Sequence, residues 1–468
     1  MIKRTLREIE SMVNGKGLKK EFKELSIQGV STDSRTIRKN QLFIPLIGEN
    51  FNGHDFISEA IEKGALASLW DENHPLPQLD FPFILVEDTL KALQQLAKEY
   101  REQLDIRVVG ITGSNGKTTT KDILASLLST KYKTQKTIGN FNNHIGTPLT
   151  LLSLEEDTEM AVIEMGTDKF GEISLLTSLA KPDVAIITNI GEAHLEDLKT
   201  RENIAKAKLE ILEGLSHEGL FIYYGDDPIL KKVMKDVDIT QKILTFGEEE
   251  GNDYRCELVH ADVNGISFTL TQPEKEDFFL PMLGKHNMYN AMAAIAAARY
   301  FDIPFDLIRE GFYHVEKTGM RNELVLAEGF TILNDSYKSN PSSLLAALDT
   351  LYNMEGYSQK IAVLGDMLGL GEDEIEMHED VGRKIAPEKI DYLFTIGPFA
   401  EYIANHAKIR FEKDRVISCK NKAHLIESIK KVMKPNSIIL VKASRPLELE
   451  EVVDRLKEEV VLPKDKVI

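Results

Sequence analysis

The sequence has little cysteine, and its two cysteines, Cys256 and Cys419, lie far apart along the chain. Two such residues exclude a disulfide framework and the closely spaced pairs of a zinc site. Long apolar runs are also missing, since no stretch approaches the roughly 20 uncharged apolar residues that span a bilayer. The start, Met1–Glu8, carries charges with no apolar segment behind them, unlike a signal peptide. We therefore expect a cytoplasmic protein without membrane insertion.

Positive charge is scarce as well. The chain has 57 lysines and arginines against 75 aspartates and glutamates, a net charge of −18. Such an acidic surface argues against broad binding to nucleic acid or anionic membranes, because both need clustered positive charge. An anionic ligand must then be held by a local basic or amide-rich site. The 42 % hydrophobic and 28 % charged residues are typical of a globular protein. At about 150 residues per domain, the length predicts about three domains.

Apolar strands that alternate with helical segments predict an α/β fold. A regular series begins at Arg107 and indicates a mostly parallel sheet. Residues 252–283 are predicted to form an antiparallel excursion, and a second α/β series starts near residue 318. We predict three domains, residues 1–103, 104–317 and 318–468. The predicted strands are Phe43–Ile47, Ala65–Trp70, Phe83–Val86, Val108–Thr112, Met160–Glu164, Val184–Asn189, Leu220–Tyr224, Thr331–Leu333, Ile361–Leu364, Tyr392–Ile396 and Ser437–Val441, and the predicted helices include Phe56–Lys63, Thr89–Gln103, Arg201–Glu213 and Asn287–Tyr300.

A glycine loop lies between the predicted strand Val108–Thr112 and a predicted helix. Glycines let backbone N–H groups turn toward phosphate oxygens, and the helix N-terminus adds positive potential. Lys117 would reach the β- and γ-phosphates, and the Thr118 hydroxyl a Mg²⁺ ion. Ile111 replaces the first glycine of the general P-loop, so the loop is the shorter G-x-x-G-K-T. A plain glycine turn with a surface lysine is the alternative, but strand, loop, lysine, threonine and helix all agree with nucleotide binding. The predicted nucleotide-binding residues are Gly113, Ser114, Asn115, Gly116, Lys117, Thr118 and Thr119.

Two later residues fall where such a site needs metal ligands. Glu164 ends a predicted strand, and His194 follows the next one. The ends of parallel strands open on one crevice, the usual ligand site of doubly wound folds. A carboxylate suits Mg²⁺, and an imidazole can join a less strict metal position. Taken singly, Glu164 could instead be an exposed strand end and His194 an ordinary surface or core histidine.

Lys208 lies in the apolar stripe of the predicted helix Arg201–Glu213, which Gly214 closes. It is four residues after Ile204, on the same face, whereas Lys206 falls on the polar face. A lysine aimed into a core must be paired, neutralised or chemically altered. Reaction with CO₂ would make it an anionic carbamate able to bind Mg²⁺. The alternative is a lysine whose amine reaches outward to solvent.

Together these motifs resemble the Mur ligases, ATP-dependent enzymes that form amide bonds in peptidoglycan synthesis, over essentially the whole chain. Thr112–Thr119 resembles their ATP loop, and Glu164–Gly166 and the His194 segment resemble their Mg²⁺ sites. Ala207–Ile211 is similar to their carbamylated-lysine segment, so the resemblance implies a carbamate on Lys208. It implies further ATP contacts in the segments Gly284–Ala291, Gly319–Arg321 and Asn334–Tyr337. The residues concerned are Asn287, Asn290 (at the adenine), Arg321 and Asp335.

The flanking motifs resemble one branch of this family. Ser31–Arg35, Leu42–Gly48 and Asn52–Asp55 resemble a UDP-sugar domain shared by the third and fourth enzymes of the series. Gly139–Gly146 and Val363–Met367 resemble the fourth, which adds D-alanyl-D-alanine to UDP-N-acetylmuramoyl-tripeptide. The resemblance therefore implies these two small-molecule substrates. The implied substrate-binding residues are Ser31, Asp33, Ser34, Arg35, Asn52, Gly53, His54, Asn140, Asn142, Asn143, Tyr337 and Asn340.

The resemblance also implies a fold and a mechanism. The expected parts are a small α/β UDP-sugar-binding domain, a central P-loop ATPase-like domain and a C-terminal Rossmann-like domain, in a monomer that uses ATP and two Mg²⁺ ions. Phosphoryl transfer to the tripeptide carboxylate would give an acyl phosphate, which the dipeptide amine then attacks. The surrounding charge must be neutralised. The implied catalytic residues are Lys117, Glu164, His194, Lys208 and Arg321.

Two positions depart from this pattern: Lys338 stands at a usual asparagine, and Ala443 at a usual glycine. Three other interpretations remain. Folylpolyglutamate synthetase resembles the fold and the ATP loop, but Ser31–Arg35 favours a UDP-sugar. The diamino-acid-adding Mur ligase is expected to carry an arginine that the run Asn340-Pro-Ser-Ser lacks. A nucleotide-dependent binding protein without ligase activity is the third.

Overall fold

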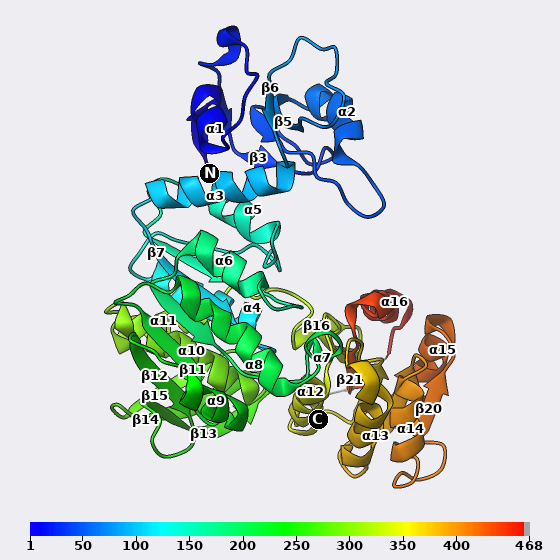
Figure 1. Ribbon diagram of the computed structural model, residues 1–468. Coiled ribbons are helices and arrows are strands. Elements are labelled where there is room, and N and C mark those ends of the chain that lie inside the picture. Colours follow the sequence, from blue (N-terminus) through cyan, green and yellow to red (C-terminus); the bar gives the residue numbers. More distant parts are fainter. Residues whose placement is uncertain (463–468) are drawn as a thin grey trace.

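The computed structural model describes residues 1–462, so the last six residues of the predicted region 318–468 lie outside the described part. The described residues form four sheets with helices packed on them, which confirms the α/β prediction. Figure 1 shows an upper lobe from the N-terminal residues, a nine-stranded sheet below it, and a six-stranded sheet beside the latter. No helix within residues 1–462 is long and apolar enough to cross a membrane.

The upper lobe contains two small sheets, an antiparallel pair β1–β2 and a parallel sheet in the order β3-β4-β5-β6. The predicted strand Phe43–Ile47 is wrong, because the ladder ends at Phe43 and Pro45, which has no N–H to donate, follows. The strand pair β1–β2 was not predicted. The elements are β1 (Lys3–Thr5), α1 (Leu6–Met12), β2 (Ser26–Gln28), β3 (Val30–Ser31), β4 (Gln41–Phe43), α2 (Ile57–Glu62), β5 (Ala65–Asp71), β6 (Phe83–Val86) and α3 (Thr89–Gln103), with 3₁₀ turns Lys20–Phe22 and Gly53–Phe56.

The central sheet has the order β15-β14-β13-β12-β11-β10-β7-β9-β8. It is parallel from β8 to β13, and β13–β15 form the predicted antiparallel excursion. Its strands are β7 (Arg107–Thr112), β8 (Thr134–Lys136), β9 (Met160–Glu164), β10 (Val184–Ile187), β11 (Leu220–Tyr224), β12 (Lys242–Gly247), β13 (Tyr254–Asp262), β14 (Gly265–Gln272) and β15 (Glu276–Leu280).

Helices cover both faces of this sheet. Successive residues of β7 point to opposite sides, and those on each side are apolar and buried under helices. Val109 and Ile111 pack with α4, α10 and α11, whereas Val108 joins the core under α3, α5, α6 and α8. The helices of this part are α4 (Lys117–Ser129), α5 (Gly146–Ser153), α6 (Glu172–Ala180), α7 (Leu195–Leu198), α8 (Arg201–Leu209), α9 (Pro228–Val233), α10 (His286–Tyr300) and α11 (Phe305–Tyr313).

The predicted helix Arg201–Glu213 is too long as an α-helix. The α-helix α8 ends at Leu209 and the chain continues as a 3₁₀ turn, Glu210–Gly214. Side chains hold this tighter turn against α6: the Glu210 carboxylate accepts N–H bonds from Gly171 and Ser174, and the Ile211 carbonyl accepts a hydrogen bond from Thr177. Such turns are frequent at helix ends.

The last sheet has the order β16-β17-β21-β18-β19-β20, and only the edge strand β16 is antiparallel to its neighbour. The four predicted strands of this region are present, whereas β16 and β20 were not predicted. The elements are β16 (Glu323–Ala327), β17 (Phe330–Asp335), α12 (Pro341–Tyr352), β18 (Gln359–Gly365), α13 (Glu374–Lys384), β19 (Tyr392–Ile396), α14 (Ala400–Ala407), β20 (Val416–Cys419), α15 (Lys422–Val432), β21 (Ser437–Lys442) and α16 (Glu450–Glu459).

Candidate active site

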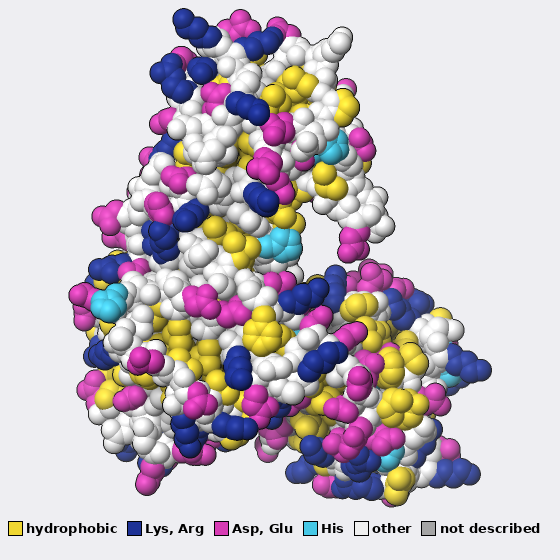
Figure 2. Space-filling model, in the orientation of Figure 1, with side chains coloured by type: hydrophobic (Ala, Val, Ile, Leu, Met, Phe, Trp, Pro, Cys, Tyr) yellow, Lys and Arg dark blue, Asp and Glu magenta, His cyan; other side chains and the backbone are white. Residues whose placement is uncertain are grey.

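A cleft of about 760 Å³ opens where the carboxyl ends of β7, β9 and β10 meet residues that follow β17. Figure 2 shows open space between the upper lobe and the C-terminal part of the molecule. Most of the nucleotide and metal residues predicted from the sequence line this cleft. They are Ser114, Asn115, Gly116, Lys117, Thr118, Thr119, Glu164, His194, Asn287, Asn290, Arg321 and Asp335, together with Asn140, Asn142, Asn143 and Tyr337.

The glycine loop joins β7 to α4 and needs glycine at two positions. Gly113 has φ +148° and Gly116 φ +80°, a region that side chains rarely adopt. A Cβ atom on Gly116 would lie 2.2 Å from Asn290 Oδ1. The loop therefore combines a helix N-terminus with a backbone that approaches α10 closely, as an anion site requires.

Lys117 begins α4, and its ammonium donates to the Gly113 carbonyl at 2.6 Å. Burial, followed by the charge of Arg321, lowers the pKa of Lys117 although Glu164 opposes the shift. The hydroxyls of Thr112 and Ser114 are buried without a hydrogen-bond partner among residues 1–462. Unpaired buried donors next to a lysine favour an oxyanion ligand at this loop.

Glu164 ends β9 and is only 1 % exposed, so it is not an exposed strand end. Its Oε1 accepts a hydrogen bond from Asn142 Nδ2 at 2.8 Å, and its Oε2 has no hydrogen-bond partner among the described residues. Lys121 Nζ lies 3.9 Å from this second oxygen. A buried carboxylate that lines the cleft and has one oxygen without a hydrogen-bond partner fits a Mg²⁺ ligand.

Lys121 and Asp122 form a buried charged group on α4 behind Glu164. Asp122 lies 3.4 Å from Lys121 and 2.9 Å from Lys136, measured between charged atoms. It also accepts hydrogen bonds from the Thr318 backbone N–H at 3.0 Å and from the Thr318 hydroxyl at 2.7 Å. The helix that starts at the phosphate loop thus holds the start of the segment leading to the last sheet. The sequence patterns did not indicate this group.

His194 has φ +67° at the start of α7, and both of its ring nitrogens are engaged. Nδ1 lies 2.6 Å from Asp168 Oδ1, and Nε2 lies 2.7 Å from Lys338 Nζ. Burial lowers the pKa of His194, and the hydrogen bond from its ring lowers the pKa of Asp168. The predicted histidine therefore lies in the cleft, held between two residues that were not assigned to the site from the sequence.

Lys208 is 1 % exposed, so its side chain does not extend outward into solvent. No hydrogen bond or ion pair joins that amine to another described residue. Burial, then the charges of Lys117 and Lys338, lower the pKa of Lys208 well below its ordinary value. This direction favours the neutral amine, the form of lysine that reacts with CO₂.

At the far end of the cleft the two predicted asparagines of α10 are buried and bonded to each other, with Asn290 Nδ2 2.9 Å from Asn287 Oδ1. The rings of Tyr224 and Tyr289 lie 5.1 Å apart and line the same end. The sequence analysis missed these two rings. Neither tyrosine is in a strong local pattern, although Tyr289 lies inside the quoted segment Gly284–Ala291.

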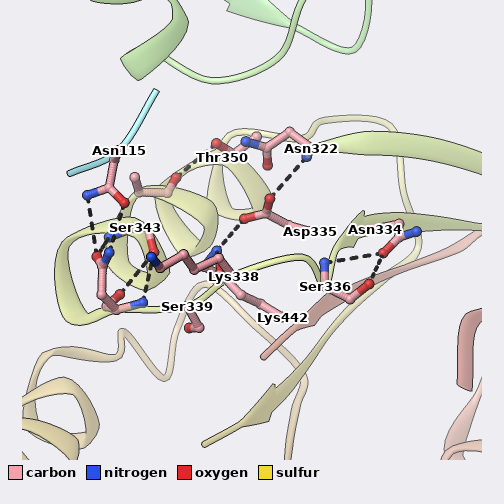
Figure 3. Close-up of polar contacts among 12 residues, drawn as sticks. Asn115, Asn322, Asn334, Asp335, Ser336, Lys338, Ser339, Ser343, Thr350 and Lys442 are labelled. Carbon is pink, nitrogen blue, oxygen red and sulfur yellow. Dashed lines mark hydrogen bonds and ion pairs between the residues drawn. The ribbon is translucent and has the colours of Figure 1, made fainter. Parts of the chain in front are cut away.

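Residues of the last sheet complete the cleft. Arg321 lies 4.0 Å above the ring of Tyr337. Asp335 accepts hydrogen bonds from Lys442 Nζ at 2.6 Å and from the Asn322 backbone at 3.2 Å, as Figure 3 shows. Lys442 is almost wholly buried and was not assigned a role from the sequence. The Asp335 carboxylate in the cleft is therefore paired with the Lys442 ammonium.

Asn340 and the two positions that depart from the family pattern differ in where they lie relative to the cleft. Asn340 is buried and caps α12, and its amide donates to Asn115 Oδ1 at 2.8 Å. Ala443, at one of the two departures, packs in the core against Gly365 rather than in the cleft. Lys338, at the other, lines the cleft, where desolvation and then the charge of Lys117 lower the pKa of Lys338 to about 8.

The predicted sugar residues lie in the upper lobe and do not line the cleft. Asp33 pairs with Arg35 at 2.9 Å, and the Ser34 hydroxyl donates to Glu59 at 2.7 Å. Asn52 caps the 3₁₀ turn that contains Gly53, and the ring of His54 stacks on His74 with centroids 4.4 Å apart. Ser31 accepts a hydrogen bond from the Asp33 backbone. These contacts order both segments within the upper lobe.

Within residues 1–462, no three His, Cys, Asp or Glu side chains converge as a metal cluster. This agrees with a Mg²⁺ site of the kind that uses one or two carboxylates and completes its coordination with phosphate oxygens. Glu164, whose Oε2 has no hydrogen-bond partner among the described residues, and Thr118 line the same cleft and fit such a role.

The chain resembles known proteins along nearly its full length. Family models described as Mur ligase family catalytic domain, Mur ligase middle domain, and Mur ligase, glutamate ligase domain match residues 26–101, 111–298 and 320–445. The UDP-N-acetylmuramoyl-tripeptide–D-alanyl-D-alanine ligase of Bacillus subtilis (strain 168) is 48 % identical over 98 % of this chain and 99 % of its own.

Solved structures agree with this likeness. A crystal structure of MurF from Acinetobacter baumannii has a TM-score of 0.87 at 29 % identity and covers 98 % of this chain and 100 % of its own. MurF ligase from Thermotoga maritima, solved in complex with ADP, has a TM-score of 0.79 at 28 % identity, with coverages of 92 % and 97 %.

Proposed function

The chain belongs to the Mur ligase family, and from this premise we propose that it is the ATP-dependent ligase that joins D-alanyl-D-alanine to UDP-N-acetylmuramoyl-tripeptide. The observation that carries the proposal is the single cleft in which the phosphate loop and Glu164 face Arg321 and Asp335. A cleft shared by two sheets can hold a nucleotide and two further reactants together, which is the main requirement of this chemistry.

Amide formation from a carboxylate stalls because oxide is a poor leaving group. In the proposed reaction the terminal carboxylate of the tripeptide attacks the γ-phosphorus of ATP, ADP leaves, and an acyl phosphate forms. The dipeptide amine then attacks the carbonyl carbon, loses a proton, and phosphate departs. Two anions meet in the first step, so Lys117 and Arg321, which flank the cleft, would neutralise the developing charge.

We propose that Thr118 and Glu164 hold Mg²⁺ when the nucleotide is bound. The ion would offset the charge of the phosphate oxygens. The free Glu164 Oε2 and the Asn142 amide that orients the other oxygen support this assignment. Asn142, predicted as a substrate residue, donates a hydrogen bond to Glu164 Oε1 in the structure. The second ion implied by the resemblance would depend on His194, whose Nε2 already contacts Lys338.

For Lys208 we propose carbamylation. The neutral amine would attack CO₂, a C–N bond would form, and one proton would leave, which gives an anionic carbamate. The buried amine without a partner supports this, because an anion there would face the positive charges of Lys117 and Lys338.

The remaining residues are proposed to bind the other substrates. Asn287 and Asn290, with the Tyr289 ring, would hold adenosine, and Ser31–Arg35 and Asn52–His54 would hold the UDP-sugar across the open space of Figure 2. We further propose that residues 1–103, 104–317 and 318–468 act as three domains that close on ATP, in a cytoplasmic monomer.

The test is phosphate release by the purified protein with ATP, Mg²⁺, the UDP-linked tripeptide and D-alanyl-D-alanine, with each omitted in turn. Release that needs both substrates, with a pentapeptide product of the matching mass, supports the proposal. A Lys117→Met variant should be inactive, whereas Lys206→Met, a lysine exposed on α8, should be unaffected. Release with a folate and glutamate, or with a diamino acid in place of the dipeptide, would instead support the two related ligases.

A further inference from the structure

Lys338 extends from the last sheet into the central part of the cleft. It lies in the short loop between β17 and α12, and Lys442 Nζ holds this loop by donating to the Lys338 carbonyl at 2.9 Å. The side chain then reaches His194 Nε2, 2.7 Å from Lys338 Nζ. Figure 3 shows Lys338 and Lys442, the last residue of β21, close to Asp335.

The hydrogen bonds of His194 define which nitrogen carries a proton. Asp168 Oδ1, 2.6 Å from Nδ1, is an acceptor only, so Nδ1 carries the hydrogen and donates it. Nε2 is left with its lone pair, the electron pair that a histidine uses to bind a metal. The Lys338 ammonium is the donor to this lone pair, and therefore takes the direction in which a metal ion would be bound.

We propose that the Lys338 ammonium replaces the second divalent cation of this site, so that the chain binds its nucleotide with one Mg²⁺ ion rather than two. The inference rests on the proposed ligase function and concerns how that site holds its charge. Lys338 is also the position where the sequence departs from the asparagine usual in the resembling family. An asparagine has no positive charge and would leave His194 Nε2 free.

The Lys338 ammonium belongs to the part of the chain that forms the last sheet, so it would enter the site together with that sheet. Two other contacts join the same loop and helix α12 to the central part: Asn340 donates to Asn115, and Ser342 donates to Glu192. Together with the Lys338–His194 contact they place the ammonium beside the phosphate loop only when the two parts are together. A diffusing ion needs no such contact, so in this chain one charge of the site is supplied by the protein itself.

The experiment counts bound ions, with Mn²⁺ as the spectroscopic substitute for Mg²⁺. Electron paramagnetic resonance of free Mn²⁺ gives the number bound per chain in the presence of the β,γ-imido analogue of ATP. The variants are Lys338→Asn and Lys338→Gln, and the matched control is Lys199→Asn, which removes the same charge at an exposed residue five positions after His194. Circular dichroism and binding of the analogue show that each variant is folded.

We expect one Mn²⁺ ion on the wild type and on Lys199→Asn, and two on Lys338→Asn. Lys338→Gln should gain the same second ion. Two ions on the wild type would overturn the proposal, as would one ion on both Lys338 variants or a second ion on the control. The count needs no turnover, so a wild type that binds one ion yet makes no pentapeptide would contradict the proposed function and leave this inference standing.

Discussion

Replacing Lys208 with methionine tests whether the native amine is neutral, the condition on which the carbamate depends. Lys208 is buried on α8 and has no partner among the described residues. Methionine has a similar length without the amine. Because an unsatisfied buried donor costs about 1–3 kcal/mol, the Lys208→Met variant should be more stable than the wild type at neutral pH by at least that amount. Its ligase turnover should nevertheless be lost.

The pH dependence of the free energy of unfolding gives a second test of the same point. The pKa of Lys208 is far lower in the native protein than its ordinary value of 10.5, which the unfolded chain retains. Between these two pKa values the unfolded chain binds one proton more, so the free energy of unfolding of the wild type rises by about 1.4 kcal/mol per pH unit. The methionine variant lacks this contribution. Its advantage over the wild type should therefore shrink as the pH rises from 7.5 to 9.0.

The assay is urea unfolding of both proteins at the two pH values in buffer freed of CO₂, so that no carbamate forms. Lys206→Met is the matched control, because Lys206 lies two residues earlier on the exposed face of the same helix. Its difference from the wild type should not vary with pH. A Lys208→Met advantage that stays constant between pH 7.5 and 9.0 would mean that the native amine is charged, and would refute the reasoning.

Three further changes test other parts of the site. Gly116→Ala should lower kcat/KM for ATP at least tenfold, because the new Cβ would clash with Asn290 of α10. The control is Gly171→Ala, which also has a positive φ but has open space around it, and its kcat/KM should stay near the wild-type value. Asp122→Asn should lower the free energy of unfolding in a urea titration by about 3 kcal/mol, because buried cations lose their partner, and a loss no larger than that of the exposed control Asp197→Asn would contradict this. Glu164→Gln should reduce phosphate release at least a hundredfold, since the carboxylate proposed for Mg²⁺ is lost, and near-normal release would rule out that role.

Local patterns in the sequence were enough to predict the α/β class and the glycine loop between β7 and α4. A loop between a strand and a helix is built from adjacent residues, so Gly113, Lys117 and Thr118 could be assigned without knowing the fold. The position of Lys208 could likewise be predicted, because the helical period decides which face a residue takes. The limits of the elements were less certain, as the 3₁₀ turn after α8 shows, since that turn depends on contacts with α6.

The partners of the site residues could not be predicted in this way. Asp168 and Lys338 meet at His194 although Lys338 is 144 residues away in the sequence, and Lys442 reaches Asp335 from a neighbouring strand. The sequence around each of these residues contains no pattern that indicates its partner. Such contacts depend on strand order and on how two sheets face each other, and those are properties of the packed chain. The sequence therefore sufficed for residues whose chemistry is arranged along one loop or one helix face, whereas charge pairing within the cleft arose only when distant segments were brought together by burial of their common cores.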